Sequence, residues 1–215
     1  MADDKQLLAD QIEELATFAD SLTDSQWDSP SLCAGWKVRD VISHMTVGGI
    51  YSPVSILTKG PKYKFSIPTM SDVFSREWGA THSGPELARE FRRVRIDHPK
   101  KFTIGTVTPT KDVLVDHITH EQDMRIPLDL PRPTPVPEER MLVALDRLPH
   151  IGSYGPKKNA AGLRLEATDY DWSYGEGLLV RGPALSIIIA IGGRPKGLDS
   201  LEGDGVEVLR SRIAA

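Results

Sequence analysis

The chain has 215 residues and a formal net charge of −4, from 26 Lys and Arg against 30 Asp and Glu. Its longest basic cluster, residues 92–101, is interrupted by Asp97 and Pro99. A slightly acidic chain of this kind is not expected to bind nucleic acid as its main partner. We interpret the basic cluster as a solvated helix face followed by a loop.

No run of 18 apolar residues occurs, and the N-terminus begins with acidic residues. These observations argue against a membrane-spanning helix and an export signal, and they predict a cytoplasmic protein. Cys33 is the single cysteine, which excludes an intrachain disulfide and fits a reducing cytosol. Because no base is adjacent to Cys33 in the sequence, we expect it to be structural.

Apolar residues at steps of four and three predict an amphipathic helix over residues 5–22, capped by Asp3 or Asp4. After a polar connection, a short helix is expected over 38–47. Residues 50–84 are interrupted by Pro53, Gly60, Pro61 and Pro68, which indicates a loop-rich excursion with a helical piece near 70–80.

A helix is predicted over residues 85–95 with Pro85 in its first turn. Thr110 is expected to cap a further helix that must end before Pro127. Several long helices joined by loops predict a helical bundle for residues 1–150.

Alternate prolines from 131 to 137 indicate a stiff connection, followed by a helix over 138–148 and a linker over 152–162. Alternating apolar residues then predict strands at 163–167 and 178–180. Residues 183–191 are almost wholly apolar and are expected to form a buried helix, followed by an amphipathic helix over 206–213. A small α+β domain, residues 156–215, packed on the bundle accounts for this pattern.

Asp116 and His120 are four residues apart, so in a helix both side chains can reach one metal ion. His44 borders the apolar stripe of the 38–47 helix and is the best third ligand. Three N and O ligands leave one coordination position open, as in catalytic zinc sites. Periodicity alone does not choose between Asp116 and His117, because Val113, His117, His120 and Met124 also form a helical stripe. The sequence His-Ile-Thr-His-Glu at 117–121 lacks the order of the zinc-protease motifs.

Three segments carry a resemblance to a known family: residues 22–45 (LTDSQWDSPSLCAGWKVRDVISHM), 116–128 (DHITHEQDMRIPL) and 162–193, with LEATDYDW and VRGPA. They resemble the mycothiol-dependent maleylpyruvate isomerase family, a branch of the DinB-like metal-binding bundles. The resemblance implies an α+β fold, a DinB-like four-helix bundle with a small C-terminal α+β domain, and the metal triad His44, Asp116 and His120. Two departures are Lys37, where many relatives have a capping Thr, and Asp116, where the isomerase has Glu.

The resemblance also implies a divalent metal, zinc or alternatively nickel, and mycothiol as the thiol cosubstrate. A thiolate bound to the metal would add reversibly to a cis double bond in an isomerase, or stay attached to an electrophile in an S-transferase. Arg76 and Arg125 are candidate catalytic groups that bind an anionic part of the small electrophilic substrate. Asp123 either pairs with Arg125 or orients His120. A non-catalytic metal-binding or sensing protein and a small-molecule carrier remain alternatives, and the sequence does not indicate the oligomeric state.

Overall fold

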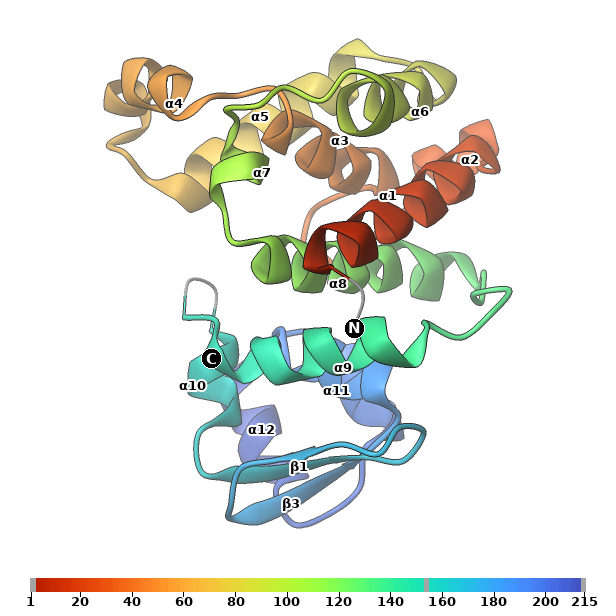
Figure 1. The fold of residues 1–215 in the computed structure, drawn as a ribbon, viewed down its shortest axis with the longest axis vertical. Coiled ribbons are helices and arrows are strands. Elements are labelled where there is room, and N and C mark those ends of the chain that lie inside the picture. The colour runs from red at the N-terminus through yellow and green to blue at the C-terminus, as the bar shows by residue number, and fades with distance from the viewer. Residues whose placement is uncertain (1–2, 153–154, 214–215) are drawn as a thin grey trace.

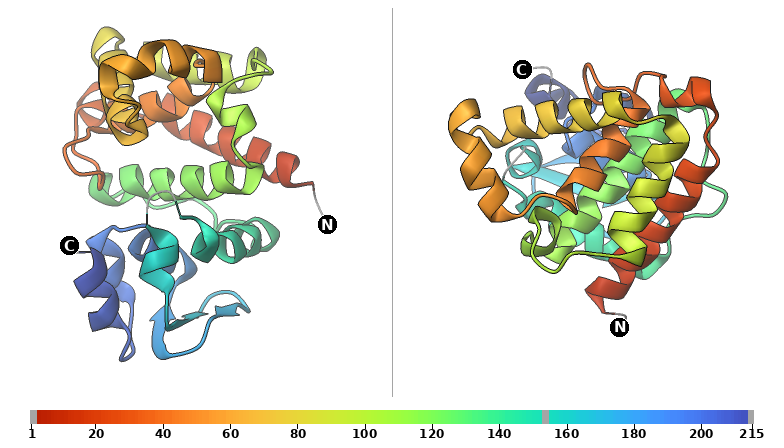
Figure 2. Two further views of the ribbon diagram at one scale, coloured as in Figure 1. Left: turned by 90° about the vertical axis from the view of Figure 1, so that its left-hand side faces the viewer. Right: turned by 90° about the horizontal axis from the view of Figure 1, so that it is seen from above.

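The computed structural model describes residues 3–152 and 155–213. It has an α+β fold, in which helices make up the first two thirds of the chain and a small sheet lies near the C-terminus (Figure 1). Figure 2 shows the long helix α8 (Thr110–Leu128) lying between the earlier helices and the C-terminal elements. This central position lets α8 contribute residues to both parts of the molecule.

The N-terminal helices form where the apolar spacing predicts them. Helix α1 (Asp4–Asp20) begins after Asp3, whose side chain accepts a hydrogen bond from the Lys5 N–H. Helix α2 (Asp24–Trp27) lies in the polar connection, and α3 (Val38–Gly48) follows it. The Lys37 N–H donates to Asp40 Oδ2 at 2.9 Å. The start of α3 is therefore capped without a threonine at position 37.

Residues 50–84 are mostly helical, so the prediction of a loop-rich excursion is wrong, although the helical piece expected near 70–80 is confirmed. They form α4 (Pro53–Lys59), a 3₁₀ turn (Gly60–Tyr63) and α5 (Ile67–Thr81). Their prolines lie in the first turns of these elements. Proline is tolerated there because the first N–H groups of a helix have no partner within it.

Helix α6 (Gly84–Arg92) continues into a π-helical turn, η2 (Arg93–Asp97). A short helix, α7 (Ile104–Val107), then leads into α8. The sequence predicts one regular helix over 85–95, and the π-helical turn is not visible in the apolar spacing.

Two boundary predictions for α8 are wrong. Pro109, not Thr110, is the N-cap residue, and the helix passes through Pro127 to Leu128. Proline lacks the N–H that would donate to the carbonyl of Asp123, four residues earlier. That carbonyl instead accepts a hydrogen bond from the Leu32 N–H at 2.9 Å. The loop before α3 thus satisfies the group that Pro127 leaves free.

The C-terminal part begins with α9 (Glu138–Arg147) and a 3₁₀ turn (Leu148–His150). Helix α10 (Pro156–Ala160) lies where a linker was predicted, and residues 153–154 of that linker lie outside the described residues. A small sheet follows, made of β1 (Leu163–Ala167), β2 (Ser173–Tyr174) and β3 (Leu178–Gly182). Its strand order is β2-β1-β3, and β1 is antiparallel to β2 and parallel to β3. The remaining elements are α11 (Ala184–Ile191), a 3₁₀ segment (Pro195–Ser200) and α12 (Val206–Ile213).

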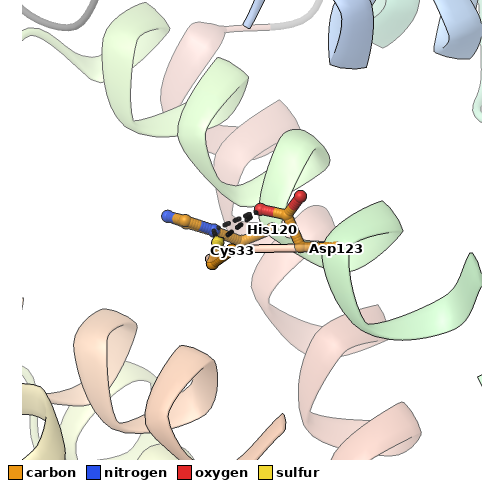
Figure 3. Close-up of side chains that lie close together, drawn as sticks. All are labelled: Cys33, His120 and Asp123. Carbon is orange, nitrogen blue, oxygen red and sulfur yellow. Dashed lines mark hydrogen bonds and ion pairs between the residues drawn. The ribbon is translucent and has the colours of Figure 1, made fainter. Parts of the chain in front are cut away.

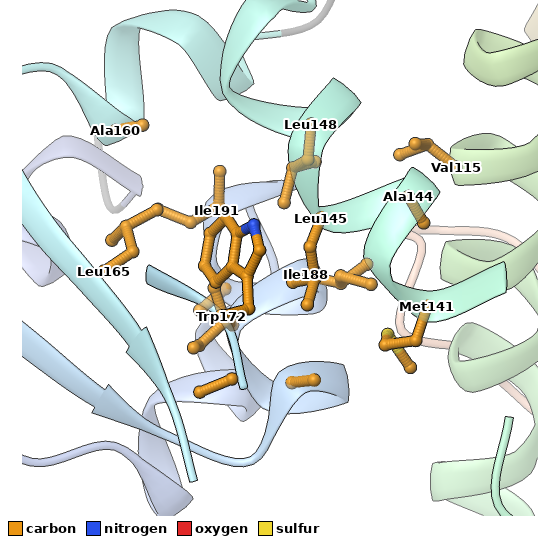
Figure 4. Packing of buried hydrophobic residues seen from close by; sticks show 14 of the residues in the cluster. Val115, Met141, Ala144, Leu145, Leu148, Ala160, Leu165, Trp172, Ile188 and Ile191 are labelled. Atoms are coloured by element: carbon orange, nitrogen blue, oxygen red, sulfur yellow. The ribbon is translucent and has the colours of Figure 1, made fainter. Parts of the chain in front are cut away.

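The largest hydrophobic core joins α8 and α9 to the C-terminal elements. Figure 4 shows Leu145 of α9 and Leu148 of the following 3₁₀ turn beside Ile188 and Ile191 of α11, with Trp172 packed near them. The apolar helix α11 is therefore buried, as its sequence predicts. A second core lies mainly among α1, α3 and α6. The larger core contains residues from both sides of the boundary between 1–150 and 156–215. Division of the chain into two domains at that boundary stays a prediction.

Within the described residues, no helix is both long and apolar enough to cross a membrane.

Candidate metal centre and its cavity

His44 on α3 and Asp116 and His120 on α8 lie together, although His44 and Asp116 are 72 positions apart in the sequence. Asp116 Oδ1 is 3.8 Å from His44 Nε2 and 3.4 Å from His120 Nε2. The two imidazole rings meet edge to face, with centroids 5.0 Å apart. One donor atom from each residue lies within 4.8 Å of the other two.

Each histidine of this set is held through its other ring nitrogen. Ser71 Oγ lies 3.0 Å from His44 Nδ1, and Asp123 Oδ2 lies 2.8 Å from His120 Nδ1. Such contacts fix the ring orientation and the tautomer of metal-binding histidines. Both Nε2 atoms therefore face Asp116. Once these nitrogens are deprotonated, two imidazoles with one carboxylate fit a divalent metal such as zinc.

Asp116 is ionised in this environment. Burial alone would raise the pKa of its carboxyl, but the positive charge of His120 and hydrogen bonds from His117, His120 and His44 hold it well below the usual range. A carboxylate that is already deprotonated can bind a metal ion without first losing a proton.

His117 is the buried residue that the apolar stripe favours, with only 2% of its side chain exposed. Its Nδ1 lies 3.3 Å from Asp116 Oδ2, and its Nε2 has no hydrogen-bond partner within the described chain. Burial and the nearby Arg95 lower the pKa of His117 to about 4. His117 is therefore a neutral neighbour of the second Asp116 oxygen.

A second group of polar side chains lies behind His120. Cys33 Sγ donates to Asp123 Oδ2 at 3.0 Å and is 3.7 Å from His120 Nδ1 (Figure 3). Arg194, after α11, binds both Asp123 oxygens at 2.9 and 2.7 Å. Cys33 therefore has potential bases beside it in the folded chain, although none is adjacent to it in the sequence. Sequence separations of 90 and 71 residues gave no signal for these contacts.

Cys33, His120 and Asp123 also lie close enough to hold a metal ion. However, the Arg194 guanidinium already occupies both Asp123 oxygens and lies 3.5 Å from Cys33 Sγ. Together with His120, it holds the pKa of the buried Asp123 carboxyl far below its usual range. A second cation beside this guanidinium would be repelled. The electrostatics therefore favour His44, Asp116 and His120 as the metal set.

A cavity of about 740 Å³ opens over these residues, a size typical of sites for small molecules. Its walls carry apolar side chains from several elements, and its polar lining includes two arginines, Arg95 and Arg194. Arg95 belongs to the basic cluster that we expected to be solvated. Instead, it donates to the Met45 carbonyl at 3.0 Å and is half-buried. The apolar lining includes Trp36, Met45, Ile67, Pro68, Ile104 and Ile151.

The two arginines predicted to bind substrate lie elsewhere. Arg76 on α5 is 46% exposed and pairs with Asp72 at 2.7 Å. Arg125 is buried, pairs with Glu121 at 2.6 Å and lies 4.1 Å from the centre of the Phe18 ring. Arg125 therefore does not pair with Asp123. Neither Arg76 nor Arg125 lines the cavity, and a role for them in substrate binding stays a prediction.

Comparison with known proteins gives a family match and a fold match. Residues 8–125 match the model of the mycothiol maleylpyruvate isomerase N-terminal domain. A crystal structure of a histidine-to-alanine mutant of the mycothiol-dependent maleylpyruvate isomerase is 13% identical, with a TM-score of 0.57 over 94% of this chain and 93% of that chain. A crystal structure of the same isomerase without that mutation is 15% identical, with a TM-score of 0.47 over the same shares. No curated protein matches the chain at a significant level.

Proposed function

The chain belongs to the family of the mycothiol maleylpyruvate isomerase N-terminal domain, and on that premise we propose that it is a metal- and thiol-dependent enzyme. The proposed reaction is attack of a low-molecular-weight thiol, mycothiol, on a small electrophilic metabolite, with isomerisation or S-transfer as the outcome. The observation that carries this proposal is the convergence of His44, Asp116 and His120 at the wall of the cavity.

His44, Asp116 and His120 would hold the metal ion, zinc or alternatively nickel. When bound, the ion would supply a Lewis acid that lowers the pKa of a thiol at its open position. Ser71 and Asp123 keep the two imidazoles oriented. The indole of Trp36 lines the cavity beside the two histidines, with ring centroids 5.5 Å from His44 and 6.4 Å from His120.

The chemistry of the electrophile decides between the two outcomes. In an isomerisation, the thiolate forms a C–S bond to an activated cis double bond, the resulting single bond rotates, and the C–S bond breaks to return the thiolate. In an S-transfer, the C–S bond forms and either a leaving group departs or a proton completes the addition. The cavity residues must therefore bind the electrophile beside the thiol in both cases.

The small-molecule carrier considered above places its ligand within the apolar C-terminal unit. Ile187 and Ile188 are fully buried there and contribute to the main core. Their side chains serve packing, so we keep the cavity over His44 and Asp116 as the proposed site. A metal-binding protein without catalysis remains the competing function that the experiment must test.

The experiment combines metal analysis with a conversion assay. The variants His44→Ala, Asp116→Ala and His120→Ala should each lose metal, because two remaining ligands bind zinc far more weakly than three. His117→Ala is the matched control and should retain it. The loaded protein should convert maleylpyruvate or small electrophiles only with mycothiol present. Loss of metal in His117→Ala but not in Asp116→Ala would overturn the ligand set, and equal turnover without thiol would overturn the thiol mechanism.

A further inference from the structure

Arg95 is the cavity arginine whose positive charge is not neutralised by a direct carboxylate contact. Its Nη1 donates to the Met45 carbonyl, and no described carboxylate forms an ion pair with it within 4.0 Å. Arg194, by contrast, is held by both Asp123 oxygens and the Gly192 carbonyl. A guanidinium has five N–H donors, so Arg95 retains donors for a ligand in the cavity.

The fold makes room for this side chain. Arg95 lies in the π-helical turn η2, in which the His98 N–H donates to the Arg93 carbonyl at 2.8 Å. Such turns occur frequently at functional sites. Glycines line the path of the side chain: a Cβ at Gly105 would lie 3.2 Å from Arg95 Nη1, and one at Gly49 would lie 3.0 Å from Arg95 Cδ. A solvated arginine would not need such clearance.

The charges near Arg95 change when a metal is bound. Burial lowers the pKa of Arg95 to about 10 while the negative charge of Asp116 opposes that shift, so the guanidinium is protonated at neutral pH. Asp116 is thus the main acidic neighbour of Arg95. A divalent cation held by Asp116 would more than neutralise this carboxylate. The cavity wall beside Arg95 would then carry net positive charge and favour an anionic group.

We propose that Arg95 binds a carboxylate of the electrophilic substrate and so fixes how that substrate lies beside the metal site. This proposal rests on the proposed function and assigns it a substrate-binding residue. A guanidinium can bind a carboxylate through two parallel hydrogen bonds, which fixes the position of the substrate as well as attracting it. Arg95 is then a specificity-determining residue.

The arrangement along α8 also separates the two reactants. Asp116 and Asp123 are seven residues apart, about 10 Å along the helix axis. Both arginines line the cavity; Arg194 forms an ion pair with Asp123, whereas Arg95 is the one on which the negative charge of Asp116 acts. The substrate carboxylate would lie at the Asp116 end. The Asp123 end, where Arg194 is already paired, would be left for the thiol cosubstrate.

The test measures carboxylate binding without any thiol. Maleate and pyruvate are titrated by calorimetry into the zinc-loaded full-length protein, with zinc content measured for every variant. We expect wild type to bind at least one of them, Arg95→Gln to bind it at least tenfold more weakly, and Arg95→Lys to lie between. Gly105→Ala keeps Arg95 but adds a Cβ 3.2 Å from its Nη1. This substitution should displace the guanidinium and also weaken carboxylate binding. Arg210→Gln removes an exposed arginine that does not line the cavity and serves as the matched control, with binding unchanged.

Two results would overturn the proposal. One is wild-type affinity in Arg95→Gln with its zinc retained, and the other is failure of both carboxylates to bind wild type. Because no thiol is present, neither result bears on thiol dependence, which the conversion assay tests separately. Arg95-dependent carboxylate binding together with thiol-independent turnover would contradict the proposed reaction alone.

Discussion

Replacement of Asp123 by Asn tests the support behind the candidate metal site. Asp123 is fully buried, and its carboxylate accepts from His120 Nδ1, Cys33 Sγ and two nitrogens of Arg194. All four neighbours are donors. Asn has nearly the same shape but replaces one acceptor oxygen with an NH₂ donor, and it carries no charge.

The magnitude follows from the two oxygens. Oδ2 accepts three of the four hydrogen bonds and Oδ1 accepts only that of Arg194 Nε. In the better orientation of Asn, its NH₂ therefore faces Arg194 Nε and one charged hydrogen bond is lost, while Arg194 also loses its counter-charge. We expect a loss of about 2–4 kcal/mol in the free energy of unfolding. Zinc affinity should fall by about 10- to 100-fold, because His120 is less firmly oriented.

The assay is urea unfolding of the metal-free protein, followed by zinc competition with a chelator. Asp199→Asn is the control, since Asp199 is 58% exposed and, within the described part of the chain, forms its ion pair with Lys196. It should change stability by less than about 1 kcal/mol. The reasoning is refuted if Asp123→Asn unfolds like Asp199→Asn and binds zinc as tightly as wild type.

Two further predictions concern stability. Burial would raise the pKa of Glu14, but hydrogen bonds and charges from Arg140 and Arg132 outweigh burial and lower the pKa. The pairing therefore stabilises the fold at pH values above the unfolded-state pKa of about 4.3. This stabilisation is lost as the pH falls through the lower folded-state pKa. Glu14→Gln should thus cost about 1 kcal/mol at pH 7, and the difference from wild type should vanish in acid; a constant difference at all pH values would contradict this. Ile188→Ala should cost about 2–5 kcal/mol in denaturant unfolding, because Ile188 is fully buried in the core shared by α9 and α11. The exposed Leu178 provides the comparison, and equal effects of the two alanine substitutions would show that this core contributes little.

Local patterns predicted most helices, since apolar spacing reflects which face is buried. Residues 50–84 were misinterpreted because a proline in the first turn of a helix cannot be told from a helix-breaking proline until the start of the helix is known. Pro127 was misinterpreted for a non-local reason, the hydrogen bond from Leu32 to the carbonyl of Asp123.

The candidate site shows a similar division. Spacing and family resemblance together indicated His44, Asp116 and His120, which the fold brings together. Helical periodicity favoured His117 because it detects the most buried face, whereas Asp116 lies at the cavity edge and its side chain is 32% exposed. Arg95 and Arg194 lie on distant elements and reach the cavity only through tertiary contacts, so no local pattern revealed them.

The central claim is that a metal held by His44, Asp116 and His120 receives the sulfur of a thiol cosubstrate. Cobalt(II) substituted for zinc makes this visible, because a sulfur ligand on cobalt gives a charge-transfer absorption band that zinc does not. Mycothiol added to the cobalt-loaded protein should produce this band, with an apparent thiol pKa below the free value of about 8.5. An unchanged cobalt spectrum at saturating thiol would contradict the account.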